Sequence, residues 1–392
     1  MKYNFDEIIN RKGTDSIKWD AGKFLKKKGF TNRFDEDTLS LFLADMDFAC
    51  PPPLLDSLHK RLDQKILGYS THSVNEEYFA ALRNWFAKRY DWKIADEEVV
   101  YCPGTVLALN VAVMTYTKPG DGIIIQRPVY PPFTGAVESH KREVINNELI
   151  NTDGYYTIDF DDLESKAKDP NTTMMIFCSP HNPVGRVWTA EEIIRVADIC
   201  SANNVLLLAD EIHGDLVLGD NIFYPTATVS DIDNLVVCTA INKTFNVAGL
   251  HCSNIIIKNK DLRERYTAEL GMAHPSPFAI SAMIAAYTEC DEWLEQLNEY
   301  LDANFEFLKN FIAEKMPKVK FVKPEGTYIG WLDFSEYGLS ANEIHDRIYN
   351  KANVVFQDGK MFSSESTQFQ RICVPTPLSI LKEAMERIAK EF

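Results

Sequence analysis

Short apolar runs alternate with helical patterns between residues 95 and 260, and this alternation limits the possible folds more than any other feature. Each run is apolar along nearly its whole length, as strands buried on both faces of a sheet are. One of the intervening helices opens with a capping box, Thr189-Ala-Glu-Glu192, before an apolar stripe. Alternating strands and helices predict an α/β fold built on a largely parallel sheet. The expected strands are residues 122–126, 173–177, 205–209, 235–238 and 254–257.

The pattern changes after about residue 285, which indicates a second, smaller α+β domain. A long helix is expected over residues 291–315. The last helix is expected to have Thr376 as its N-cap and Pro377 at its first helical position. Between them we expect short strands at residues 328–332, 353–356 and 369–374.

The N-terminal residues show too little periodicity to fold alone, so we expect them to pack on the smaller domain. The chain of 392 residues is long enough for two domains. The predicted division is a large domain over residues 46–285 and a small domain made of residues 1–45 and 286–392.

Charge and composition narrow the class of partner. The formal net charge is −16, which argues against nucleic acid as a partner because binding a polyanion needs a basic face. A local cationic pocket for one phosphate group is still compatible with this charge. No apolar run reaches 18 residues and the N-terminus has no apolar signal core, so we expect a cytoplasmic protein without a membrane partner.

The eight cysteines contain no Cys-x-x-Cys pair, and several of them fall within apolar strand patterns. They are therefore interpreted as buried free thiols of a reducing compartment. No cluster of histidine and cysteine has the spacing of a zinc site, so no metal is expected.

A lysine and an acid follow two of the predicted strands, and together they point to one cofactor. Lys243 comes just past the run 235–238, in a predicted loop, and Asp210 follows the run 205–209 directly. Either residue alone has an ordinary explanation, as a solvated loop lysine or as a turn acid. A pyridoxal 5′-phosphate (PLP) enzyme requires both, because the lysine bonds to the cofactor and the acid keeps the pyridine nitrogen protonated.

Two further residues stand where a flat, phosphorylated ligand could be held. Gly104 precedes an apolar helical pattern, and the free amides of a helix N-terminus suit a phosphate. A plain turn from strand to helix would give the same pattern. Tyr130 follows the run 122–126 and could either stack on a ring or pack under the neighbouring prolines.

Two polar residues could recognise a substrate. Asn182 lies between Pro180 and Pro183, which make a stiff turn that aims it at the open edge of the sheet. Arg371 lies among apolar neighbours in a predicted strand, so it needs an anionic partner. That partner is either a substrate carboxylate held by the guanidinium fork or an acid of the protein itself.

The order of Gly104, Tyr130, Asn182, Asp210, Lys243 and Arg371 resembles fold-type I PLP enzymes, the aspartate aminotransferase superfamily, from about residue 40 onward. Within it, the chain resembles the branch of PatB/MalY-type cystathionine β-lyases. This resemblance implies a mostly parallel, mixed seven-stranded sheet with a smaller α+β domain. It rests on Ala-Asp-Met-Asp-Phe at 44–48, Gly-Tyr-Ser at 68–70, the segment 178–188, Asp-Glu-Ile-His at 210–213 and Lys-Thr-Phe-Asn-Val-Ala-Gly-Leu at 243–250.

The resemblance also implies roles for individual residues. Lys243 would bond to PLP, Asp210 would contact the pyridine nitrogen and Tyr130 would stack on the ring. Asn182 and Arg371 would hold the substrate carboxylate. The remaining implied contacts are the backbone amides of Gly104, Thr105 and Val106 at the phosphate, Asn182 and His213 near the ring hydroxyl, and Tyr69 at the phosphate and substrate from a neighbouring subunit, which makes the active unit a homodimer.

Two features depart from the family pattern. Many relatives have a phosphate-binding serine three residues before the lysine, where this chain has Ala240. The phosphate would then depend on other donors, with Thr239 and Thr105 as candidates. The segment around Arg371 also departs from the usual pattern, which leaves the choice of substrate open.

The resemblance implies α,β-elimination of L-cystathionine or a related cysteine S-conjugate, with pyruvate, ammonia and a thiol such as homocysteine as products. An aminotransferase would use the same lysine, aspartate, asparagine and arginine. A regulatory protein that keeps PLP and acts through a protein partner is a second alternative. A binding module without PLP would leave Lys243, Asp210 and Asn182 unexplained.

Overall fold

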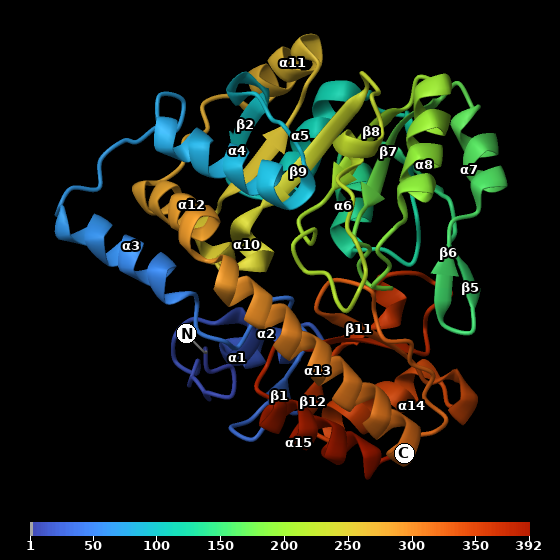
Figure 1. The fold of residues 1–392 in the computed structure, drawn as a ribbon. Coiled ribbons are helices and arrows are strands. Elements are labelled where there is room, and N and C mark those ends of the chain that lie inside the picture. The colour runs from blue at the N-terminus through green and yellow to red at the C-terminus, as the bar shows by residue number, and fades with distance from the viewer. Residues whose placement is uncertain (1–2) are drawn as a thin grey trace.

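A seven-stranded sheet forms the centre of the larger part of the computed structural model, which describes residues 3–392 (Figure 1). Neighbouring strands are parallel except at β10, which is antiparallel to both of its neighbours. This confirms the predicted mostly parallel, mixed seven-stranded sheet. In spatial order the strands are β2 (Val99–Cys102), β10 (Ser253–Ile256), β9 (Leu235–Ala240), β8 (Leu206–Asp210), β7 (Thr172–Cys178), β3 (Gly122–Ile125) and β4 (Glu143–Asn146).

The five strands expected from apolar runs are all present. The two others, β2 and β4, were not recognised individually from the sequence. β4 is an edge strand whose residues are exposed or half-buried, so it lacks the apolar pattern of a central strand. A small hairpin, β5 (Ile150–Thr152) with β6 (Tyr155–Thr157), stands outside this sheet.

Helices cover both faces of the sheet, because alternate strand residues point to opposite sides. Ile123, Met174 and Leu208 contribute to a core with the helices α5, α6 and α11. Ile124 and Met175 contribute to the core on the other face. The helices of the larger part are α3 (Pro52–Asp63), α4 (Glu76–Tyr90), α5 (Thr105–Tyr116), α6 (Pro131–Ser139), α7 (Phe160–Ala167), α8 (Ala190–Ala202), α9 (Thr226–Val229), α10 (Ile241–Thr244), α11 (Lys260–Leu270) and α12 (Pro277–Glu289).

The C-terminal part has its own three-stranded sheet, in the order β11-β14-β13. The predicted long helix is present as α13. The predicted start of the last helix is wrong by one residue, because Pro377 is the N-cap and Thr376 lies before it. The elements of the C-terminal part are α13 (Asp291–Lys315), β11 (Ile329–Asp333), α14 (Ala341–His345), β12 (Val354–Val355), β13 (Gln357–Asp358), β14 (Phe369–Cys373) and α15 (Leu378–Ala389).

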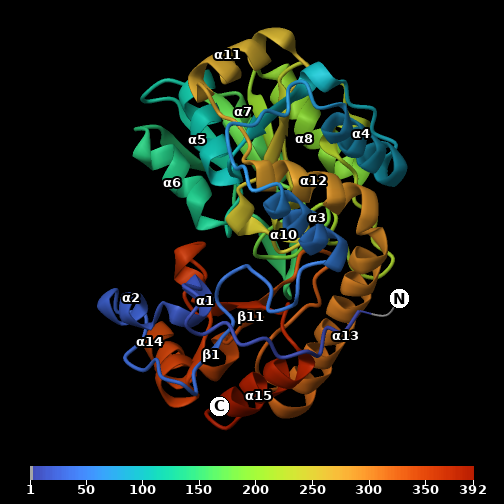
Figure 2. The ribbon, with the colours of Figure 1, turned by 90° about the vertical axis from the view of Figure 1, so that its left-hand side faces the viewer.

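The N-terminal segment lies against this C-terminal part, as the blue and red ribbons in Figure 2 show. It contains α1 (Ile17–Asp20), α2 (Gly22–Lys27) and β1 (Leu39–Ser40). β1 pairs in parallel with β12, with Leu39 opposite Val354. The exact domain boundaries at residues 45 and 285 stay a prediction.

No helix in residues 3–392 combines the length and the apolarity that crossing a bilayer requires. In the same residues, no group of three or more His, Cys, Asp or Glu side chains is arranged to hold a metal ion.

Candidate active site

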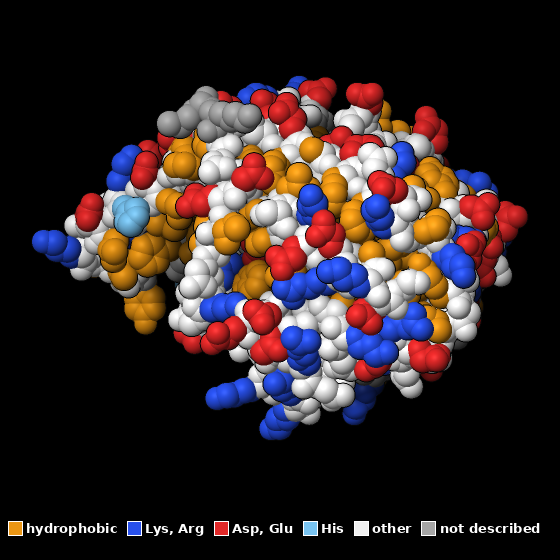
Figure 3. Space-filling view, turned by 90° about the horizontal axis from the view of Figure 1, so that it is seen from below, with side chains coloured by type: hydrophobic (Ala, Val, Ile, Leu, Met, Phe, Trp, Pro, Cys, Tyr) orange, Lys and Arg blue, Asp and Glu red, His pale blue; other side chains and the backbone are white. Residues whose placement is uncertain are grey.

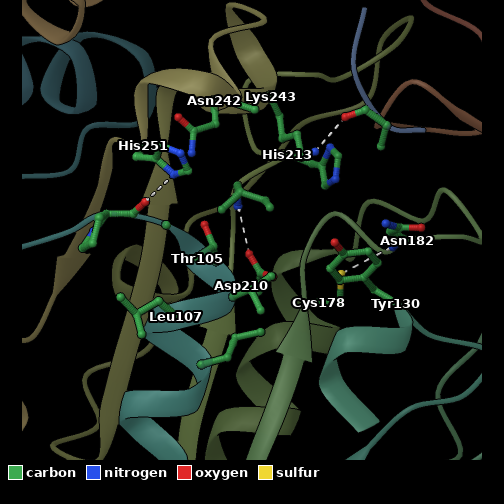
Figure 4. A pocket seen from close by; sticks show the side chains of 17 residues that line it. Thr105, Leu107, Tyr130, Cys178, Asn182, Asp210, His213, Asn242, Lys243 and His251 are labelled. Atoms are coloured by element: carbon green, nitrogen blue, oxygen red, sulfur yellow. Dashed lines mark hydrogen bonds between the residues drawn. The ribbon is translucent and has the colours of Figure 1, made fainter. Parts of the chain in front are cut away.

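A cavity of about 480 Å³ opens at the carboxyl ends of the parallel strands (Figure 4). Asp210 is the last residue of β8, Cys178 is the last of β7, and Lys243 follows β9. Carboxyl ends of parallel strands meet at one edge of a sheet, which is where α/β proteins bind ligands. Of the residues predicted from the sequence, those that line the cavity are Gly104, Thr105, Val106, Tyr130, Asn182, Asp210, His213 and Lys243.

Lys243 projects into this cavity from the single helical turn α10, rather than from the predicted loop. Its Nζ donates a hydrogen bond to the backbone oxygen of Ala44, at 2.7 Å. Burial lowers the pKa of Lys243, and the nearby charge of Arg371 lowers it further. A lowered pKa favours the neutral form of an amine, which a nucleophile or a base requires.

Asp210 is a buried acid without a cation partner. Its side chain is 4% exposed, and its one hydrogen bond in the structure comes from the backbone amide of Ile212, at a long 3.4 Å. Among residues 3–392, no lysine, arginine or histidine forms an ion pair with it. Burial raises the pKa of Asp210 to about 7. A cationic group of a ligand beside this carboxylate would restore its ionised form.

Arg371 is also buried, at 2% exposure, and it lies behind Asn182. Its Nη1 donates to the side-chain oxygen of Asn182 at 3.2 Å, and its Nη2 donates to the backbone oxygen of Phe42 at 3.0 Å. Its Nε has no hydrogen-bond partner. Within the described part of the chain no acid forms an ion pair with Arg371, so the alternative of an internal salt bridge does not apply. An anion of a ligand is the remaining partner for this cation.

Tyr130 and His213 both line the cavity, as Figure 4 shows. The backbone amide of Tyr130 donates to the backbone oxygen of Asn182 at 3.1 Å, which fixes these two segments together. Burial lowers the pKa of His213 to about 3, and the charges of Lys243 and Arg371 act in the same direction. His213 is therefore a neutral imidazole, and its Nδ1 has no hydrogen-bond partner.

The N-terminus of α5 closes the end of the cavity beside Thr105. Gly104 is the N-cap of this helix, and no side chain caps it. A Cβ built on Gly104 would meet nothing within 4 Å, so the backbone there is open to a ligand. The first amides of a helix have no intrahelical acceptor and carry partial positive charge, which suits a phosphate.

Three residues predicted for the site do not line the cavity. Arg371 lies behind the cavity wall and donates a hydrogen bond to Asn182, which lines the cavity. The hydroxyl of Thr239 donates to the backbone oxygen of Asn254, at 2.9 Å, and so is engaged outside the cavity. Tyr69 is fully exposed on its own chain.

Sequence reasoning also missed cavity residues. Asn242 and His251 both line the cavity, and neither was assigned a role. Asn242 directly precedes Lys243, which was an available signal. His251 had no signal, because its contact with Pro103 joins residues 148 positions apart.

The chain is similar to known proteins over nearly its whole length. A family model described as aminotransferase class I and II matches residues 40–388. Cystathionine beta-lyase PatB of Bacillus subtilis strain 168 is 39% identical over 391 residues, which cover 98% of each protein. The structure of cystalysin from Treponema denticola, which contains PLP, matches with a TM-score of 0.94 and 37% identity, over 100% of this chain and 99% of that one. The PLP-bound C-S lyase from Staphylococcus hominis matches with a TM-score of 0.94 and 32% identity, over 100% and 98% of the two chains.

Proposed function

Because the chain belongs to the class I and II aminotransferase family, we propose that it is a PLP-dependent carbon–sulfur β-lyase. Its substrate is L-cystathionine or a related cysteine S-conjugate, and its products are pyruvate, ammonia and a thiol. The observation that carries this proposal is the 39% identity to a cystathionine beta-lyase across 98% of both proteins. The cavity supports it with the groups that the reaction needs.

The cavity residues fit PLP group by group. When bound, PLP supplies an electron-withdrawing ring that makes the Cα–H bond of an attached amino acid acidic. Asp210, which has no cation partner in the described chain, would face the ring nitrogen, and Tyr130 would stack on the ring. The open amides at Gly104, Thr105 and Val106 would hold the phosphate. His213, which has an unpartnered nitrogen, would lie near the ring hydroxyl together with Asn182.

Lys243 has two tasks in this proposal. Its Nζ would hold the cofactor covalently, and the same Nζ would take the proton from Cα of the substrate. Burial lowers the pKa of Lys243, which favours the neutral amine that accepting this proton requires. The electron pair left at Cα then forms the Cα–Cβ double bond while the Cβ–S bond breaks and the thiolate leaves. Addition of water to the released product gives pyruvate and ammonia.

Arg371 and Asn182 would hold the substrate carboxylate. The guanidinium of Arg371 is buried, and its Nε is free to donate. A charge-assisted hydrogen bond in a buried site is strong and directional, so it would fix Cα near Lys243.

The protein would act as a homodimer with a shared site. Figure 3 shows apolar side chains gathered on the arm that projects at the left of the molecule, which consists of α3 and the segment after it. Exposed apolar surface of this kind is typical of an interface. Tyr69 belongs to this arm and is free to reach the phosphate site of a partner subunit. The exposed apolar residues of the arm are Leu55, Leu62, Ile66, Leu67, Tyr69 and Val74.

An absorbance scan of the purified protein, followed by addition of L-cystathionine, tests the proposal. We expect a visible PLP band and release of pyruvate and thiol in equal amounts. Amino-group transfer to an added keto acid without release of thiol would show an aminotransferase instead. Absence of any PLP band after incubation with PLP would refute the role of Lys243.

A further inference from the structure

The end of the cavity beside α5 carries two side chains that have no role so far. Figure 4 shows Asn242 and His251 close together above Thr105, on the far side of the cavity from Asn182 and Tyr130. Asn242 comes from α10, and His251 comes from the segment between α10 and β10. Both therefore face the N-terminus of α5, and not the end where the substrate carboxylate would lie.

Asn242 presents a free amide group to this end of the cavity. Its Oδ1 accepts a hydrogen bond from the backbone amide of Cys252, at 3.5 Å. This contact orients the side chain and leaves both hydrogens of Nδ2 available. In the described chain no protein acceptor binds Nδ2. An amide nitrogen is a donor only, so its natural ligand is an acceptor such as a phosphate oxygen.

His251 is oriented by its contact with Pro103. Its Nδ1 lies 3.1 Å from the backbone oxygen of Pro103, and a carbonyl oxygen can only accept, so Nδ1 carries the hydrogen. Nε2 is left for a ligand, and in the protonated ring it donates as well. Because Pro103 directly precedes the N-cap Gly104, the imidazole is held at the mouth of the same helix end.

Two neighbouring side chains at this end of the cavity offer no free hydrogen-bond donor to a phosphate. Ala240 has no hydrogen-bonding side chain, and the hydroxyl of Thr239 is engaged by Asn254. Among the described residues that line the cavity, Lys243 is the only lysine or arginine, and its Nζ bonds to Ala44. Within one chain, the partners for a phosphate at this end are then the amides of the helix end and the side chains of Asn242 and His251.

We propose that Asn242 and His251 bind the 5′-phosphate of PLP beside the amides of α5, with Nδ2 of Asn242 donating to a phosphate oxygen and Nε2 of His251 facing the phosphate. This assignment rests on the proposed PLP function. It adds two phosphate-binding side chains to a site in which position 240 is an alanine. It implies that the affinity for PLP depends on these side chains only through the phosphate group.

The test compares PLP with pyridoxal, which has the same ring and aldehyde but no phosphate. Dissociation constants are measured by absorbance on the full-length, cofactor-free protein, for the wild type, Asn242→Ala and His251→Ala. We expect each substitution to raise the dissociation constant of PLP by roughly ten- to a hundredfold, as loss of a hydrogen bond to a charged group does. The dissociation constant of pyridoxal should stay unchanged. Inorganic phosphate should also compete with PLP less effectively in both variants.

His140→Ala is the matched control, because this histidine bonds to Asn110 and does not line the cavity. It should leave both dissociation constants unchanged. Equal weakening of PLP and pyridoxal in the Asn242 and His251 variants, or no weakening, would overturn the proposal. If His251→Ala does not fold, His251→Gln removes the imidazole with a smaller change in shape, and the same comparison applies. Failure of the wild type to bind PLP at all would refute the proposed function instead.

Discussion

The buried carboxylate of Asp210 should destabilise the folded protein when PLP is absent, and Asp210→Asn tests this directly. Burial raises the pKa of Asp210 from 3.8 to about 7. An acid with a raised pKa binds its proton more tightly in the folded state than in the unfolded state. The contribution of Asp210 to the free energy of unfolding therefore falls as the pH rises from about 4 to about 7, and this contribution is constant above that range.

The size of the effect follows from the same shift. One pKa unit corresponds to 1.36 kcal/mol, so the raised pKa of Asp210 lowers the free energy of unfolding by about 2 kcal/mol at pH 5 and by about 4 kcal/mol at pH 8. The side chain is 4% exposed, so solvent screens little of this cost. Asn has nearly the same shape and no charge. The cofactor-free Asp210→Asn variant should therefore be more stable than the wild type, by a margin that grows between these two pH values.

Urea unfolding followed by tryptophan fluorescence at pH 5 and pH 8 measures this margin. Asp47→Asn is the matched control, because Asp47 is equally buried but has cation partners. Burial opposes its ionisation, yet Lys18 and Arg11 hold the pKa of Asp47 below its ordinary value. Its removal should therefore destabilise the protein at pH 8. An Asp210→Asn variant that is less stable than the wild type at pH 8, or whose margin does not change with pH, would refute the reasoning.

Three further predictions concern the proposed reaction. Lys243→Ala should fold with an unchanged circular dichroism spectrum and release no pyruvate from L-cystathionine; substantial remaining turnover would rule out Lys243 as the base. Arg371→Gln should lower kcat/KM by at least about thirtyfold, because a buried charge partner of the carboxylate is lost; an unchanged kcat/KM would remove Arg371 from substrate binding. Inactive Lys243→Ala and Tyr69→Ala proteins, mixed under conditions that exchange subunits, should recover about a quarter of wild-type activity, because a hybrid dimer has one site with both residues intact. No recovery would contradict a shared site.

The sequence was informative where one physical cause dominates. Strands buried on both faces must be apolar throughout, so β3, β7, β8, β9 and β10 could be recognised from composition alone. The capping box of α8 is also present, with the hydroxyl of Thr189 accepting from the amide of Glu192 at 3.2 Å. Local hydrogen bonding decides such a helix start, so no tertiary information was needed.

The sequence failed where tertiary contacts decide. Thr376 has the chemistry of an N-cap, but the chain turns into α15 one residue later, and its hydroxyl is left without a partner. Thr239 was a candidate phosphate donor because it lies near Lys243 in sequence. Both faces of β9 are buried, so the pattern could not show that its hydroxyl bonds to Asn254. His251 reaches the cavity only because β10 pairs with β2, with Ser253 opposite Cys102, which brings it to Pro103.

The groups that mark the cavity are those that the chain itself leaves poorly paired. Asp210 is a buried acid without a cation, Lys243 is a half-buried amine with a lowered pKa, and Arg371 is a buried guanidinium whose Nε has no acceptor. Each costs the folded protein free energy, because burial removes its hydration without full replacement. A ligand that places a cation beside Asp210 and an anion beside Arg371 removes these costs only in the folded state. Binding then stabilises the fold in proportion to the logarithm of ligand concentration over Kd, so the features that weaken the free protein are those that favour cofactor and substrate.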